Sequence, residues 1–145
     1  MNWAALLYWV WLQPTQPEPL DARLERAIEW TESGDVATVR NGANRGIWQV
    51  NPRYATPLVR ANPDLLYVKP VCRAEGRRML RMWLRSCGGN LRCALAAYNC
   101  GWGGTKGTCG QGYASTVLRR AKEAHWSVDY VAEHCRACPE CCFED

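Results

Sequence analysis

Three stretches predict the fold of this chain: Glu32-Ser33-Gly34, Gly46-Ile47-Trp48-Gln49-Val50-Asn51-Pro52 and Ala96-Ala97-Tyr98-Asn99-Cys100-Gly101. The first follows a face that recurs every three or four positions, at Leu20, Leu24, Ala27, Ile28 and Thr31. This spacing is typical of one side of an amphipathic helix. The glycine at position 34 is a helix stop signal, so Glu32 is expected at the helix end.

Three further helices are expected downstream. They cover 71–86, 90–99, with Asn90 as N-cap, and 112–124. The residues expected to face inward are Ala74, Met79, Met82, Trp83, Leu91, Leu95, Tyr98, Tyr113, Val117, Leu118 and Ala121. Residues 34–46 form a loop in which any strands would be minor. The sequence therefore predicts one mainly α domain with a small irregular or β loop region.

Composition limits the class of protein. With 145 residues, 48% hydrophobic and 22% charged, the chain suits one globular domain. A net charge of +4 fits an anionic polymer as partner. The chain has no Gly-rich phosphate loop, no zinc-finger spacing with paired His and no dense Lys/Arg run, so we expect no nucleic-acid partner.

Nine cysteines in a chain of this length predict disulfides and an oxidising compartment. The main body contains Cys72, Cys87, Cys93, Cys100 and Cys109, and the tail contains Cys135, Cys138, Cys141 and Cys142. Cys100 and Cys109 bracket a Gly-rich loop and are the first pair we expect. The odd number leaves at least one thiol free, metal-bound or paired with another chain. A zinc site on the four tail cysteines is an alternative to disulfides there.

The two ends of the chain differ from the middle. Residues 3–12 are almost wholly apolar but too few to span a membrane. They fit an atypical export signal, a buried arm or an anchor to a partner or lipid. Residues 13–19 form a Pro-rich linker. We therefore divide the chain into an arm and linker at 1–19, a domain at 20–126 and a Cys-rich tail at 127–145.

The three stretches together resemble the SLT-type lytic transglycosylases of the lysozyme-like superfamily. The second is similar to the family's G-L-M-Q-x-x-P segment, the third to A-A-Y-N-A-G, and Tyr113 opens a segment similar to Y-V-x-x-V-L. The resemblance covers roughly residues 20–122. Three positions depart from the family pattern. Arg40 occupies the position of the usual Ser, for which Thr38 or Asn41 could substitute. Trp48 replaces a Met and is expected to change the groove wall, and Cys100 replaces a small residue.

The resemblance implies a mechanism. Glu32 would protonate the glycosidic oxygen and then remove the proton of the muramic acid C6 hydroxyl, closing a 1,6-anhydro ring without a cofactor. The implied substrate-binding residues are Ser33, Gln49, Asn51, Tyr98, Asn99 and Tyr113. Structural roles are open for most of them: Gln49 and Asn99 as caps, the two tyrosines as core residues, and Ser33 as the end of the helix.

Two other functions remain open. A lysozyme that transfers to water would need a second carboxylate, and Asp35, Asp64 and Glu75 are weak candidates. A non-catalytic wall-binding or virion module is the second alternative. The substrate would place the protein outside the cytoplasmic membrane, in the periplasm, secreted or in a phage particle. In a phage the protein would serve wall opening during entry, with residues 3–12 docked to a virion or tail protein.

Overall fold

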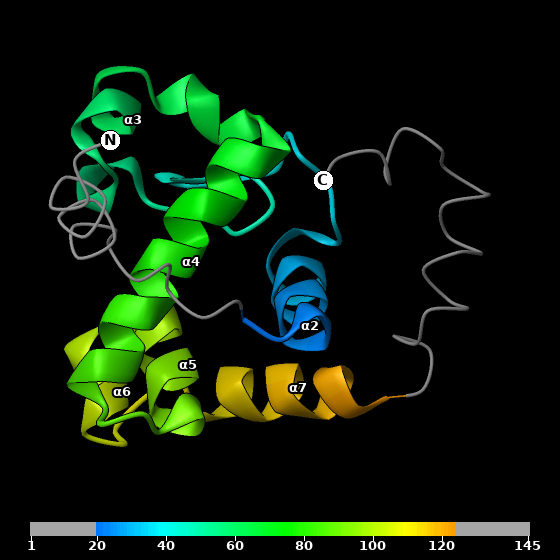
Figure 1. Cartoon of the computed structure of the whole chain (residues 1–145), viewed down its shortest axis with the longest axis vertical. Coiled ribbons are helices and arrows are strands. Elements are labelled where there is room, and N and C mark those ends of the chain that lie inside the picture. The colour runs from blue at the N-terminus through cyan, green and yellow to red at the C-terminus, as the bar shows by residue number, and fades with distance from the viewer. Residues whose placement is uncertain (1–19, 124–145) are drawn as a thin grey trace, which may run out of the picture.

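A computed structural model describes residues 20–123, which form one mainly helical domain (Figure 1). The elements, in chain order, are α2 (Ala22–Ser33), β1 (Arg40–Asn41), β2 (Asn44–Arg45), the 3-10 helix η1 (Pro52–Tyr54), α3 (Pro57–Ala61), the 3-10 helix η2 (Pro63–Tyr67), α4 (Lys69–Ser86), α5 (Leu91–Cys100), α6 (Trp102–Thr105) and α7 (Gln111–Lys122). The mainly α fold predicted from the sequence is confirmed.

Helix α2 begins and ends with local signals that the sequence contains. The Asp21 carboxylate accepts hydrogen bonds from the backbone N–H groups of Arg23 and Leu24, which caps the first turn. Gly34 adopts the left-handed conformation, with φ 63°, and its N–H bonds the Trp30 carbonyl. Glu32 therefore lies in the last turn of the helix, as predicted.

Helix α4 is the long helix that links the upper part of the molecule in Figure 1, with α3, to the lower part, with α5 and α6. Its buried residues are Cys72, Glu75, Gly76, Leu80 and Trp83. The inward placement predicted for Ala74 and Met82 is wrong, because both are exposed. A carboxylate and a glycine occupy the buried stripe, so the apolar pattern alone does not reveal which face is inward.

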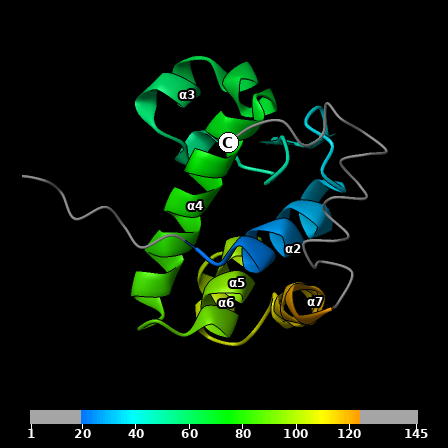
Figure 2. The same ribbon diagram turned by 45° about the vertical axis from the view of Figure 1, so that its right-hand side comes forward.

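Helix α5 lies between α4 and α7 and supplies a run of buried residues, Ala94, Leu95, Ala96 and Ala97. The Asn90 side chain accepts from the Cys93 N–H at 3.0 Å, which confirms the predicted N-cap. Helix α7 buries Ala114 and Val117 and lies beside α2 (Figures 1 and 2). This contact brings the catalytic candidate on α2 next to the N-terminal half of α7.

The loop region contains one two-stranded antiparallel sheet, in which Arg40 pairs with Arg45 and Asn41 with Asn44. No helix or strand was expected between residues 52 and 67, where two 3-10 helices and α3 form. Two disulfides join Cys87 to Cys93 and Cys100 to Cys109. The second pair was predicted and the first was not.

Several predictions concern residues outside 20–123: the apolar arm at 3–12, its docking to a virion, and the zinc alternative at 135–142. They stay predictions. Within the described part of the chain, no helix combines the length and apolar character that a membrane crossing requires.

Candidate active site

The Glu32 carboxylate faces α7 and contacts one side chain of that helix directly. The Tyr113 hydroxyl donates a hydrogen bond of 2.6 Å to Glu32 Oε1. Helix α7 is fixed beside α2 by a second bond, from Arg120 to the Thr31 hydroxyl at 2.9 Å. Among the described residues, the bond from Tyr113 is the hydrogen bond that reaches the Glu32 carboxylate.

Helix α2 carries three glutamates, and α4 neutralises two of them. Arg77 binds Glu25 through two nitrogens at 2.8 and 2.6 Å. Arg73 binds Glu29 in the same way at 2.6 and 3.4 Å. Among the described residues, Glu32 has no such cation and only the neutral tyrosine hydroxyl as donor. The same helix therefore holds two structural carboxylates and one chemically distinct carboxylate.

This environment changes the protonation of Glu32. Burial disfavours the charged form and raises the pKa of the Glu32 carboxyl from 4.5 to about 7, against the smaller lowering by the Tyr113 hydrogen bond. A carboxyl with this pKa is protonated in about half of the molecules at neutral pH, which is the state that a general acid needs.

Tyr98 joins α5 to the segment that contains Trp48. Its hydroxyl donates to the Trp48 carbonyl at 2.7 Å, and the two rings pack edge to face at 6.1 Å. Burial, and secondarily the charge of Glu32, raises the pKa of the Tyr98 hydroxyl well above its ordinary value. Both tyrosines near Glu32 therefore keep their protons at neutral pH, since burial raises the Tyr113 pKa as well.

Trp48 is fully buried, which corrects the expectation that it changes a groove wall. Its indole N–H donates to Glu29 Oε1 at 2.9 Å, and its backbone N–H contacts the Cys72 sulfur at 3.4 Å. The ring packs on Gly76 so closely that a Cβ there would lie 2.3 Å from a ring carbon. The tryptophan is thus a core residue that joins α2 and α4.

Gln49 has a strained backbone and one unsatisfied atom. Its φ is +45°, a conformation that side-chain-bearing residues rarely adopt. Its amide nitrogen donates to the carbonyls of Val39 and Gly46 at 3.1 and 2.8 Å, which fixes the amide. Its Oε1 is buried without a hydrogen-bond partner among the described residues. Most buried acceptors in folded proteins have a partner, so this oxygen is an exception.

The remaining candidate residues have different surroundings. The Ser33 hydroxyl donates to the carbonyls of Glu29 and Ile47, each at 3.0 Å, so it joins the helix end to the second stretch. The Asn51 side chain accepts from the Arg53 N–H at 3.0 Å and caps η1. Asn99 is exposed at the end of α5. The structure therefore gives Ser33 the structural contact that the sequence left open, and it gives Asn51 a helix-capping contact that was not predicted.

The three candidates for a second carboxylate are held by other groups. Asp35 pairs with Lys69 at 3.2 Å, and Asp64 pairs with Arg45 at 2.6 Å. Glu75 is buried and accepts from the Thr56 N–H and from Arg78. None of the three hydrogen-bonds to Glu32 or to Tyr113 in the described structure.

Sequence reasoning missed Glu29 and Arg73. Glu29 is almost completely buried, with an exposed fraction of 1%. Its position three residues before Glu32, on the apolar side of α2, was the available signal, because a carboxylate within a buried stripe needs a cation. That cation comes from a residue 44 positions later, which no local pattern identifies.

A mainly helical domain with a buried carboxyl at a helix end, without a cationic partner among the described residues, is consistent with a lysozyme-like class of protein. A family model described as "Transglycosylase SLT domain" matches residues 10–116. The chain therefore belongs to this family, whose function is that of lytic transglycosylases acting on peptidoglycan. Comparisons with curated proteins and with solved structures give no match.

Proposed function

We propose that this protein cleaves the β-1,4 bond between N-acetylmuramic acid and N-acetylglucosamine and forms a 1,6-anhydro end, with Glu32 as the acid and then the base. The observation that carries the proposal is the Glu32 carboxyl, whose pKa is about 7 and which has no cationic partner within 20–123. Half of the carboxyls can donate a proton at neutral pH, and the other half can accept one.

The chemistry proceeds in two proton transfers. Protonated Glu32 gives its proton to the glycosidic oxygen as the bond to the anomeric carbon breaks, and the substrate's acetamido group stabilises the cationic carbon. The carboxylate then takes the proton of the C6 hydroxyl, whose oxygen attacks that carbon and closes the ring. The carboxyl ends in its starting state, so no cofactor and no second carboxylate is needed.

The neighbouring groups support this sequence. The Tyr113 hydroxyl stabilises the carboxylate form between the two steps, because it donates to Oε1. Gln49 is held rigidly beside this region, because its amide nitrogen donates to the carbonyls of Val39 and Gly46. The ion pairs of Asp35 and Asp64, and the contacts of Glu75, favour this reaction over a two-carboxylate hydrolase.

The substrate lies outside the cytoplasmic membrane, and we propose that the protein acts there. The disulfides are consistent with an oxidising compartment.

Mass spectrometry of the muropeptides released from purified peptidoglycan tests the proposal. We expect products that end in 1,6-anhydro-muramic acid, which are lighter by one water than hydrolysed ends. Glu32→Gln should abolish release, while Glu25→Gln, on the same helix but paired with Arg77, should retain it. Reducing ends would instead make the protein a lysozyme, and peptidoglycan binding without any product would make it a wall-binding module.

A further inference from the structure

Helix α5 is tied at both ends by disulfides. Cys87–Cys93 joins the end of α4 to the first turn of α5, with the two Cα atoms 5.9 Å apart. Cys100–Cys109 joins the last residue of α5 to the segment that precedes α7, with Cα atoms 6.3 Å apart. All four cysteine residues are partly exposed.

The second of these disulfides lies between the two tyrosines of the site. Tyr98 precedes Cys100 by two residues, and Tyr113 follows Cys109 by four. Tyr98 bonds the Trp48 carbonyl and Tyr113 bonds the Glu32 carboxylate. The disulfide therefore connects, by the shortest covalent path, two residues that converge on the catalytic acid from different helices.

The loop closed by this disulfide fits tightly against α5. A Cβ on Gly104 or Gly110 would lie 2.3 Å from backbone atoms of Ala96 or Ala97, and one on Gly103 would lie 2.6 Å from the Cys109 sulfur. Gly110, next to α7, has φ 75°. Because glycine adds backbone freedom, a loop of this composition needs the crosslink to keep one arrangement.

We propose that the Cys100–Cys109 disulfide is a positioning element for Tyr113 at the Glu32 carboxyl, and that its reduction switches cleavage off. The inference rests on the proposed function. A dithiol reductant supplies two electrons and two protons: the S–S bond breaks, two cysteine thiols form, and the reductant leaves as a cyclic disulfide. Oxidation by the reverse reaction restores activity, so the enzyme is inactive in a reducing compartment and active in an oxidising one.

Two other parts of the molecule serve as comparisons. The cysteines of the Cys87–Cys93 disulfide are partly exposed, like Cys100 and Cys109, but this disulfide lies at the opposite end of α5 from both tyrosines. Cys72, the free cysteine among the described residues, is buried, and burial raises its thiol pKa to about 11. Cys72 therefore stays out of the exchange, since the thiolate is the attacking species.

The test compares two full-length double variants without reductant, Cys100→Ser/Cys109→Ser and Cys87→Ser/Cys93→Ser. The assay follows muropeptide release on both sides of neutral pH and titrates the Glu32 carboxyl by 13C NMR, with Glu32→Gln for assignment. When α7 loosens, two effects act on the Glu32 pKa: loss of the Tyr113 hydrogen bond raises it, and entry of water, which removes the larger effect of burial, lowers it. At neutral pH we expect the rate of muropeptide release by the first variant to fall about tenfold or more, and its pH–rate profile to move to lower pH. The second variant should keep the wild-type profile.

Several results would overturn the inference. One is a wild-type rate and profile in Cys100→Ser/Cys109→Ser, and another is an equal loss in both variants with unchanged profiles. If the wild type itself is inactive, the proposed function fails, but the NMR titration still tests the positioning role of the disulfide. Identical Glu32 titration curves in the wild type and in Cys100→Ser/Cys109→Ser would overturn that role.

A second measurement tests the proposal even if Cys100→Ser/Cys109→Ser fails to fold. Folded Cys87→Ser/Cys93→Ser protein is treated with dithiol under native conditions and then reoxidised. We expect a reversible loss of activity together with the shift to lower pH. Unchanged activity after complete reduction, measured by thiol counting, would contradict the proposal.

Discussion

The raised pKa of Glu32 makes a prediction about stability that needs no substrate. A carboxyl whose pKa is higher in the folded state than in the unfolded state binds its proton more tightly when folded. Protonation therefore stabilises the fold, and this contribution is fully present below pH 4.5 and is lost as the pH rises through about 7. The difference between 4.5 and about 7 corresponds to about 3 kcal/mol of unfolding free energy.

Glu32→Gln removes this titration. Relative to wild type, the variant should gain about 3 kcal/mol between acidic and mildly alkaline pH, with the change centred between the two pKa values. Urea unfolding at a series of pH values, followed by tryptophan fluorescence, measures the difference. The matched control is Glu25→Gln, which breaks the ion pair with Arg77 and should not gain stability as the pH rises. A pH-independent difference for Glu32→Gln would refute the buried, cation-free environment deduced for this carboxyl.

Three further predictions follow from contacts in the domain. Tyr113→Phe removes a hydrogen bond to the charged carboxylate while keeping its burial, so the Glu32 pKa should rise by about one unit, and the alkaline limb of the pH–rate profile should move upward with it. Gly76→Ala should lower the unfolding free energy by about 1–3 kcal/mol, because the added Cβ would lie 2.3 Å from the buried indole. Gly112→Ala in α7 is the control: its Cβ meets open space, so this variant should be neutral or stabilising in thermal unfolding. Arg73→Met removes the nearest cation from the buried Glu29 carboxylate, which keeps only the more distant Arg26 at 3.8 Å, and should cost about 3 kcal/mol; a loss below 1 kcal/mol would contradict the importance of the Arg73 pair.

Local patterns were sufficient for the helix that carries the acid. The three-four spacing, the Asp21 cap and Gly34 all act within a few residues of one another, so the end of α2 and the place of Glu32 follow from sequence. The Asn90 cap and the Cys100–Cys109 pair are equally local.

Long-range contacts explain what sequence reasoning missed. Trp48 was assigned to a groove wall because the related position is a Met, yet its ring is buried beside a glycine 28 positions later. The inward face of α4 was predicted correctly at Met79 and Trp83 and wrongly at Ala74 and Met82. Glu75 and Gly76 lie on the buried side, where Thr56 and Arg78 bond the glutamate and the indole requires the glycine. Neither partner is visible in a hydropathy pattern.

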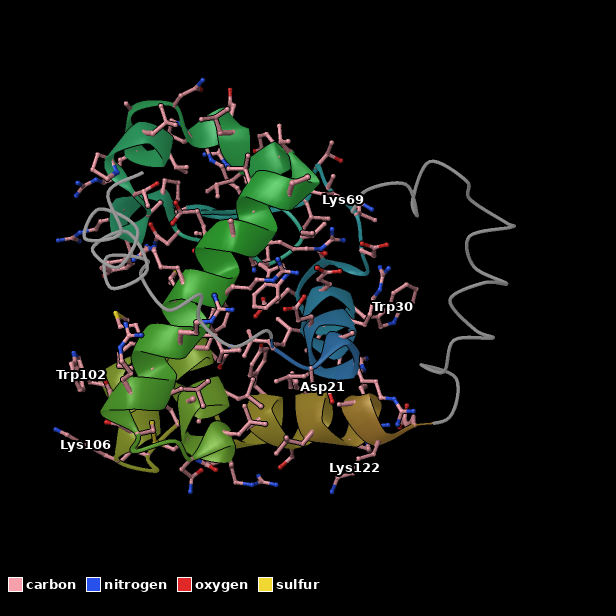
Figure 3. All side chains as sticks on the ribbon, in the orientation of Figure 1. Asp21, Trp30, Lys69, Trp102, Lys106 and Lys122 are labelled. Atoms are coloured by element: carbon pink, nitrogen blue, oxygen red, sulfur yellow. A yellow bond between two sulfur atoms is a disulfide. The ribbon has the colours of Figure 1, made fainter. Side chains whose placement is uncertain are left out.

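Figure 3 shows side chains from α2 and α4 meeting in the space between the two helices. Trp48 makes three separate contacts with the surrounding helices. Its indole N–H donates to Glu29 of α2, its carbonyl accepts from Tyr98 of α5, and its ring packs on Gly76 of α4. Such a residue cannot change alone during evolution. A Met at this position would remove the close ring contact with Gly76 and the hydrogen bond to Glu29. We therefore expect these three positions to vary together among homologues, as one inherited unit.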